Sequence, residues 1–280
     1  MTASITADPS NGFSRNPIAG GAHGDIYICA SGGTIVKRLR TSNRQIAAQL
    51  VCQEFELQSA MFKLFQEIDG IHVPKPLSVD PERGTIEMEY CPGTPLLSLL
   101  RMRARSTRES IESAAVRMTA VARILATAPE LGKRYDFAPH NALFDPDRSV
   151  LTLVDFGVYP ALQQLRSDPA LQVQLISTFL ASGLYECVRP SHVRRLGFAS
   201  QMRILGSKVA SDSQLIHPGL TPAIRSTAWE IFRAKAWKGS FQRQAWYRTG
   251  GSAAFGAHLE RILMTMSPAH PELGRPVGDD

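Results

Sequence analysis

The pattern of hydrophobic and polar positions divides the chain into a strand-rich first part and a mostly helical second part. Two short runs rich in β-branched residues, 26–30 and 34–39, flank a glycine-containing turn at 31–33 and predict a β-hairpin. Apolar residues then recur at offsets of three, four and seven over residues 43–67, which predicts an amphipathic helix. The apolar positions that make this pattern are Ile46, Leu50, Val51, Leu57, Met61 and Leu64. The alternating segment at 85–90 predicts one more strand.

A break at 91–95, with two prolines and a glycine, is the expected boundary between two lobes. Ser106 and Glu109 have the spacing of a capping box, which predicts a helix from Ser106 to about residue 128. Two extended segments, 135–144 and 150–156, surround a turn at 145–147. The remaining residues are mainly helical, with breaks near residues 190, 218 and 250.

This order of elements predicts an α+β, two-lobed fold. We expect a flexible tail over residues 1–15, a small β-rich N-terminal lobe over 16–90 with one main helix, and a larger, mainly helical C-terminal lobe over 91–280. The length of 280 residues suits one large domain or two small lobes.

Composition is that of a globular protein, with 44% hydrophobic and 20% charged residues. No apolar stretch reaches 18 residues, and the first 17 residues have no apolar signal core, so we expect a cytoplasmic protein. Export by a non-classical route, as an effector, is the alternative. The four cysteines are far apart in the sequence, which argues against a zinc site or a disulfide framework and fits a reducing compartment.

A glycine-rich bend at 20–24 precedes the first strand and favours phosphate binding, because backbone N–H groups hold phosphates where no side chain blocks them. Lys37 lies on the strand that returns from this bend and is placed to reach the α- and β-phosphates of a nucleotide. Glu54 and Glu56 follow within one turn of the predicted helix, and either one is able to pair with Lys37. We prefer Glu54, because Val51 and Leu57 flank it on the inward face.

Two acidic motifs in the second part supply the remaining chemistry. Asp136 precedes Asn141 by five residues, so one loop offers a carboxylate to accept a hydroxyl proton and an amide oxygen to bind Mg²⁺. Asp155 follows an apolar strand in a DFG sequence and offers a hard oxygen ligand for the same cation. Asn141 and Asp155 are separated by enough residues for a β-hairpin that returns both side chains to one place.

Taken together, these motifs resemble those of the protein-kinase-like superfamily over about residues 18–160. The matching segments are AGGAHGDIY, TIVK, IEMEYCPG, DFAPHN and DFG. Within the superfamily, VPKPL and DFAPHN are similar to small RIO-type atypical kinases and to aminoglycoside and choline phosphotransferases. The resemblance implies an ATP site between the lobes, with Gly20, Gly21 and Gly24 over the phosphates, Lys37 paired with Glu54, the backbone of Glu89, Tyr90 and Cys91 at the adenine, Asp136 as catalytic base, and Asn141 and Asp155 as metal ligands.

Three departures from the family pattern stand out. Ala19 replaces the usual first glycine of the loop. Arg134 replaces the usual histidine two residues before the catalytic aspartate, and we expect this cation to lower the pKa of Asp136. No APE motif follows Gly157, which puts regulation by loop phosphorylation in doubt.

The sequence therefore predicts a phosphotransferase that uses ATP and Mg²⁺, with Mn²⁺ as the alternative metal. A Ser/Thr protein kinase is our first expectation, with a protein substrate as partner; a small-molecule (aminoglycoside, sugar or choline-like) phosphotransferase and a non-catalytic nucleotide-binding scaffold are the alternatives. The net charge of +6 permits an acidic partner. Basic residues interleave with aromatic residues over 229–248, but their helical spacing favours core packing over nucleic-acid binding.

Overall fold

The computed structural model describes residues 14, 16–20, 24–29, 32–102, 105–157, 169–189, 197–215, 217–237 and 241–266. Most of the expected tail lies outside these ranges, as does Gly21. Ser14 is an exception, because it is buried and its backbone N–H donates to the carbonyl oxygen of Ile28 at 2.9 Å. The chain is therefore anchored to the first sheet from Ser14 onward.

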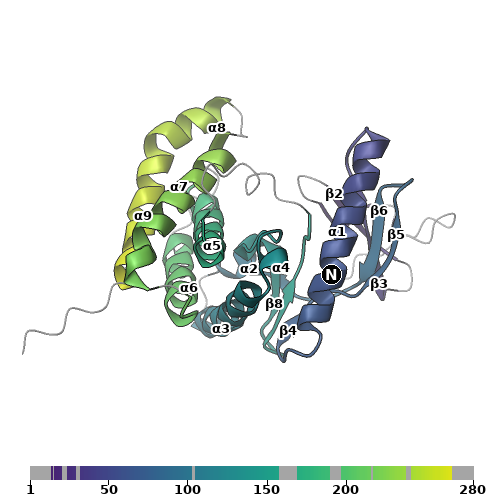
Figure 1. Cartoon of the computed structure of the whole chain (residues 1–280), viewed down its shortest axis with the longest axis horizontal. Helices are drawn as coiled ribbons and strands as arrows, with labels where there is room; N and C mark the ends of the chain where they lie inside the picture. Colours follow the sequence, from purple (N-terminus) through teal and green to yellow (C-terminus); the bar gives the residue numbers. More distant parts are fainter. Residues whose placement is uncertain are drawn as a thin grey trace, which may run out of the picture.

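The N-terminal lobe is built on a five-stranded antiparallel sheet in the order β1-β2-β3-β6-β5 (Figure 1). The strands are β1 (Ala19–Gly20), β2 (Gly24–Ile28), β3 (Thr34–Leu39), β5 (Pro76–Asp80) and β6 (Thr85–Glu89). The predicted hairpin is confirmed, although its first strand begins and ends two residues earlier than expected. In the register of this hairpin Lys37 lies opposite Ile26 on one side and Ile86 on the other, in the middle of the sheet.

Helix α1 (Arg44–Phe65) crosses this sheet and confirms the predicted helix. Asn43 caps its N-terminus by accepting a hydrogen bond from the backbone N–H of Ile46 at 3.2 Å. The predicted apolar face is wrong in part, because Ile46 and Leu50 are 48% and 38% exposed. The buried residues of α1 are Ala47, Val51, Glu54, Leu57, Gln58, Met61 and Phe65. The buried face therefore includes two polar side chains, Glu54, which was expected there, and Gln58, which was not.

A second sheet, in the order β4-β9-β8-β7, lies between the first sheet and the helices. Its strands are β4 (Ile71–His72), β7 (Thr94–Pro95), β8 (Ala142–Asp145) and β9 (Val150–Leu153). Strands β8 and β9 form the expected antiparallel hairpin, whereas β4 pairs with β9 in parallel. Strand β4 therefore connects the end of α1 to the hairpin that carries the candidate site.

The C-terminal part is mostly helical. Its helices are α2 (Leu96–Leu99), α3 (Arg105–Thr127), α4 (Pro129–Gly132), α5 (Leu171–Cys187), α6 (Phe198–Asp212), α7 (Thr221–Trp237), α8 (Phe241–Trp246) and α9 (Ser252–Thr265). Helix α3 begins one residue before Ser106, so Ser106 lies inside its first turn rather than at the expected cap. Helix α5 is central, because it packs against α3, α6, α7 and α9.

The architecture is therefore a two-lobed α+β arrangement, as the sequence predicts, with a β-sheet and one main helix in the first lobe and a helical second lobe (Figure 1). The largest core cluster extends from Leu57 of α1 to Leu263 of α9. A smaller cluster of Val51, Ile86 and Met88 holds α1 to the sheet. Among the described residues, no helix has the length and apolar character needed to span a membrane.

Candidate active site

Lys37 lies between two carboxylates that come from distant parts of the chain. Its Nζ donates to Glu54 Oε1 at 2.5 Å and to Asp155 Oδ1 at 2.7 Å. Strand β3 supplies the lysine, α1 supplies Glu54, and the segment after β9 supplies Asp155. Glu56 is exposed on α1, so the structure selects Glu54 of the two candidate glutamates. The residues that the sequence placed at the phosphates and at the metal are thus in direct contact.

The charges of this cluster do not balance. Burial lowers the pKa of the Lys37 ammonium. The contacts with Asp155 and Glu54 raise this pKa by more than burial lowers it, so the lysine stays charged. Burial also raises the pKa of Asp155, but the contact with Lys37 outweighs this and holds that pKa below its usual value. Burial raises the pKa of Glu54 against the opposing effect of Lys37. One cation thus faces two carboxyl groups, of which Asp155 loses its proton more readily than usual and Glu54 less readily.

Asp155 has an unusual backbone conformation. Its φ is +58°, in the left-handed region that costs an L-residue about 1–2 kcal/mol. The side chain is 51% exposed even though one of its oxygens contacts the buried Lys37. The backbone turn therefore presents the Asp155 carboxylate both to Lys37 and to the open space beside it.

The hairpin of β8 and β9 brings Asn141 next to the Asp155 segment, as the spacing of these residues predicts. Ala142 pairs with Leu153, and the N–H of Val154 donates to the carbonyl oxygen of Asn141 at 2.9 Å. The amide Nδ2 of Asn141 donates to the backbone oxygen of Asp136 at 3.0 Å. This bond holds the amide nitrogen, so the side-chain oxygen of Asn141 is the atom available to a cation.

Tyr135 fixes the loop and the hairpin to each other. Its hydroxyl donates to the carbonyl oxygen of Asn141 at 3.1 Å and to that of Val154 at 3.4 Å. Its ring stacks on Phe156 with centroids 5.5 Å apart. Burial raises the pKa of Tyr135 well above its usual value, so the hydroxyl remains a donor. No sequence motif assigned a role to Tyr135, although it stands directly before the candidate base.

Asp136 is buried, with 3% of the residue exposed. Burial raises the pKa of its carboxyl, but Lys235, His140 and Asn141 together lower it below the usual value. His140 Nε2 lies 3.3 Å from Asp136 Oδ2, whereas Oδ1 has no hydrogen-bond partner among the described residues. The carboxylate is therefore ionised and has one oxygen to accept a proton.

The expected influence of Arg134 on this aspartate is wrong. Arg134 is exposed, and its guanidinium donates to the backbone oxygen of Gln53 at 3.4 Å. The cation that acts on Asp136 is Lys235 of α7, whose Nζ also donates to Ser182 Oγ at 2.7 Å. The only signal for Lys235 in the sequence was its place in a basic segment, which gave no indication of its neighbours.

The glycines of the nucleotide loop are described in part. Gly20 ends β1 and lies opposite Asp25 of β2, while Gly21 falls outside the described residues. A Cβ atom at Gly24 would lie 2.7 Å from the carbonyl oxygen of Arg38, so the close approach of β2 and β3 requires glycine there. Gly24 therefore has a structural reason to be glycine in addition to any contact with phosphates.

The expected adenine segment lies at the end of β6. The N–H of Glu89 donates to Lys75 O at 3.0 Å, and that of Tyr90 donates to Gly33 O at 3.1 Å. Both N–H groups are therefore already used, and the backbone of Cys91 is the next position along the segment. Burial and the Glu89 carboxylate raise the pKa of the Cys91 thiol to about 12, so this thiol is neutral at physiological pH.

The basic and aromatic segment of α7 is largely core. Phe232 is buried and stacks on Phe255 with centroids 4.0 Å apart. Arg233 lies over the ring of Trp229, 5.7 Å from its centroid. These rings are used for packing, as their helical spacing predicts.

No family model matches the sequence, and no curated protein matches it either. The fold is similar to solved structures over most of the chain. One is the erythromycin complex of Rv3197 from Mycobacterium tuberculosis, with 14% identity, a TM-score of 0.40, and coverage of 90% of this chain and 74% of that one. Another is the streptomycin–ATP–APH(2")-IIa ternary complex, with 12% identity, a TM-score of 0.43, and coverage of 95% and 100%. A third is the apo form of PpkA-294, with 13% identity, a TM-score of 0.44, and coverage of 82% and 99%.

Proposed function

We propose that this protein is an ATP-dependent phosphotransferase that moves the γ-phosphate of ATP to a hydroxyl group. The observation that carries the proposal is the contact of Lys37 with both Glu54 and Asp155, at 2.5 and 2.7 Å. A buried lysine held by two carboxylates is positioned to bind nucleotide phosphates, because its charge is opposite to theirs. The metal ion that accompanies the phosphates would be bound by a carboxylate beside the lysine.

The nucleotide would lie between the two sheets. Lys37 would bind the α- and β-phosphates, with Glu54 holding the lysine in place, under the loop that contains Gly20, Gly21 and Gly24. The backbone from Glu89 to Cys91 would contact the adenine.

The oxygens of Asn141 and Asp155 form a donor set that suits a hard cation, and the unbalanced charge beside Lys37 favours one. These two residues would hold Mg²⁺, with Mn²⁺ as the alternative. The bound ion would neutralise charge on the phosphates. Asp155 would keep one carboxylate oxygen toward Lys37, and Asn141 would stay oriented by its bond to the backbone of Asp136.

Asp136 would be the catalytic base. Its ionised carboxylate would accept the proton of the attacking hydroxyl while the hydroxyl oxygen forms a bond to the γ-phosphorus. The bond between that phosphorus and the β–γ bridging oxygen would break in line, and ADP would leave. His140, 3.3 Å from the carboxylate, would orient the base.

We infer that the acceptor is a Ser/Thr hydroxyl on a protein. Beyond Gly157 the sequence has 14 Lys and Arg residues against 8 Asp and Glu residues, and Lys235 acts directly on Asp136. This charge disfavours a polycationic acceptor such as an aminoglycoside. A neutral small alcohol is the second candidate, because Asp136 would accept its proton in the same way and the basic surroundings would not repel it.

The test is transfer of radiolabelled phosphate from ATP in Mg²⁺ or Mn²⁺, to a basic protein, to lysate proteins and to a panel of small alcohols. We expect Asp136→Asn to lower transfer at least about 100-fold, the usual contribution of a general base. Glu54→Gln should lower it at least about tenfold, about 1.4 kcal/mol of transition-state stabilisation. Glu56→Gln is the matched control on the same helix and should retain wild-type activity.

Each arm has a distinct meaning. Activity in Asp136→Asn equal to wild type would overturn the assigned base. Equal activity in Glu54→Gln and Glu56→Gln would overturn the role of the Lys37 pair. Label on small alcohols alone would exclude the protein acceptor but keep the phosphotransferase. ATP binding without any transfer would leave the nucleotide-binding scaffold.

A further inference from the structure

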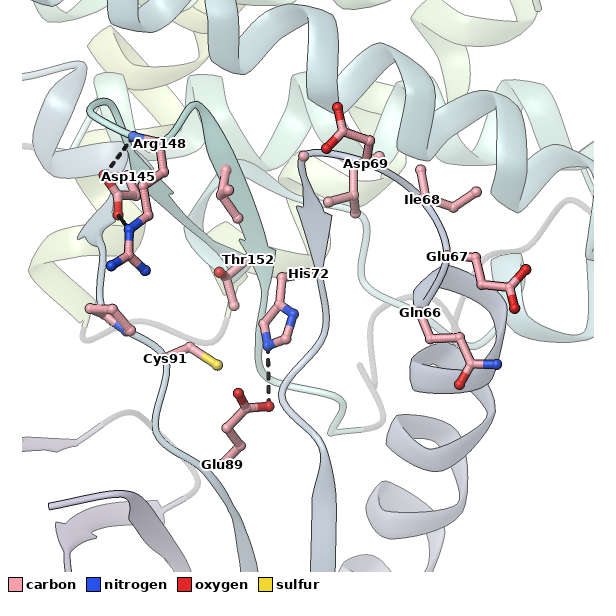
Figure 2. Close-up of a pocket in the computed structure, with 14 residues that line it drawn as sticks. Gln66, Glu67, Ile68, Asp69, His72, Glu89, Cys91, Asp145, Arg148 and Thr152 are labelled. Carbon is pink, nitrogen blue, oxygen red and sulfur yellow. Dashed lines mark hydrogen bonds and ion pairs between the residues drawn. The ribbon is translucent and has the colours of Figure 1, made fainter.

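A second group of side chains, all of types that bind metal ions, lies at the segment that joins the two lobes. His72 of β4, Glu89 at the end of β6 and Cys91 each place one potential ligand atom within 4.8 Å of the other two. Figure 2 shows the three side chains pointing toward one another, His72 from one segment and Glu89 and Cys91 from another. The wide spacing of cysteines in the sequence predicted no zinc site, but the fold brings one cysteine to a histidine and a carboxylate.

The group uses the side chains of Glu89 and Cys91, whose backbone is the expected adenine segment, but it includes none of the residues expected at the phosphates, the metal or the base. It lines a cavity of about 580 Å³ whose wall includes Ile71, Pro92, Asp145 and Thr152. None of Lys37, Glu54, Asp136, Asn141 or Asp155 lines this cavity. The residues His72, Glu89 and Cys91 are partly buried, so a small ion can reach them from the cavity without passing through the nucleotide site.

The geometry is close to that of a metal centre before the ion enters. His72 Nε2 lies 3.2 Å from Glu89 Oε2, and two ligands of tetrahedral zinc at 2.0–2.1 Å lie about 3.3 Å apart. Glu89 is held from the other side, because Oε2 also accepts a bond from the Lys75 backbone N–H at 3.1 Å. The Cys91 sulfur lies within 4.8 Å of the ligand atoms of His72 and Glu89, so a small shift would bring it to a zinc–sulfur bond of about 2.3 Å.

We propose that His72, Glu89 and Cys91 form a binding site for Zn²⁺, with the fourth coordination position open to the cavity. An imidazole, a carboxylate and a thiol are a donor set for zinc rather than for Mg²⁺, which prefers oxygen ligands alone. The bound ion would link β4 to the segment after β6. Metal binding would release the thiol proton, since cysteine ligates as the thiolate.

The first test is Co²⁺ titration of the tag-free full-length protein, followed by absorption spectroscopy. Wild type should bind one equivalent and show a sulfur-to-cobalt charge-transfer band with intense tetrahedral d–d bands. Cys91→Ser should lose the charge-transfer band. Cys52→Ser changes another partly buried free cysteine on α1 and should retain it.

The second test is Zn²⁺ affinity by competition with a chromophoric chelator. We expect His72→Ala, Glu89→Gln and Cys91→Ser each to weaken binding at least about tenfold, because even residues outside the ligand shell change affinity 10–100-fold. His217→Ala, an exposed histidine, is the matched control. Circular dichroism of each metal-free variant checks that it folds. The proposal is overturned if wild type takes up no zinc, or if Cys91→Ser binds zinc and cobalt as wild type does.

Discussion

Asp136 shows how a single side chain obtains its chemistry from residues that the sequence does not place beside it. An aspartate this deeply buried would ordinarily hold its proton more tightly, because burial disfavours the charged form. Lys235 and His140 reverse this effect and keep the pKa of the carboxyl below its usual value. His140 is an exposed loop residue whose Nε2 lies 3.3 Å from the carboxylate. Lys235 was visible only as one of several cations.

We predict that Lys235→Met will raise the pKa of Asp136, because the buried carboxyl then loses the charged neighbour that lowers its pKa most. The wild-type base is ionised throughout the neutral range. The acidic limb of kcat/KM in the variant should therefore move to higher pH, while activity at alkaline pH recovers toward the wild-type value. The measurement is the pH profile of phosphate transfer.

Lys235→Arg keeps the cation and should keep the acidic limb close to its wild-type position. Lys208→Met removes a lysine from α6 and serves as the matched control. A limb that stays in place in Lys235→Met, with activity reduced equally at every pH, would show that the lysine acts on structure and not on the base.

At the scale of elements, α1 was predicted well in extent, and its inward face was predicted correctly at Val51, Glu54 and Leu57 but not at Ile46 and Leu50. Periodicity counts apolar residues, and it therefore included Ile46 and Leu50 in the buried face. On the observed face, Glu54 reaches Lys37, and Gln58 donates to the backbone oxygen of Pro74 at 2.8 Å. Periodicity of apolar residues does not register a buried polar residue such as Gln58.

This orientation predicts which positions of α1 contribute to stability. Leu57 is fully buried, so Leu57→Ala should lower the free energy of unfolding by about 2–5 kcal/mol. Ile46→Ala removes a side chain that is about half exposed, and should change it by less than about 0.5 kcal/mol. Urea unfolding followed by circular dichroism measures both. Similar losses in the two variants would mean that Ile46 is buried after all.

At the scale of the whole molecule, some features follow from local sequence patterns and others depend on how distant segments pair. The hairpin of β2 and β3, helix α1 and the hairpin of β8 and β9 follow from local patterns, and they bring Lys37, Glu54 and Asp155 together. The parallel pairing of β4 with β9 has no local signal, because it joins a two-residue strand to a distant segment. His72 and Cys91 meet only through that pairing and the path of the chain after β6. Contacts set by tertiary topology were therefore the ones that the sequence did not predict.

The charge imbalance at Lys37 leads to a prediction for the stability of the whole chain. Without nucleotide, one ammonium faces the carboxyl groups of Glu54 and Asp155. Mg²⁺ and ATP together should raise the melting temperature, because a ligand at 100 times its Kd stabilises the folded state by about 2.7 kcal/mol. ATP with EDTA should give a smaller shift, since the exposed Asp155 carboxylate then repels the phosphates. Differential scanning fluorimetry provides the measurement.

The variant Asp155→Asn distinguishes the stabilisation by Mg²⁺ from the stabilisation by ATP in this experiment. Its melting temperature with ATP and EDTA should be at least that of wild type under the same conditions, because the repelling charge is gone. Its additional gain from Mg²⁺ should be lost, because the carboxylate ligand is gone as well. Asp147→Asn, in the exposed turn between β8 and β9, should behave as wild type. An equal magnesium-dependent gain in Asp155→Asn and wild type would mean that the ion binds elsewhere and that Asp155 serves only to hold Lys37.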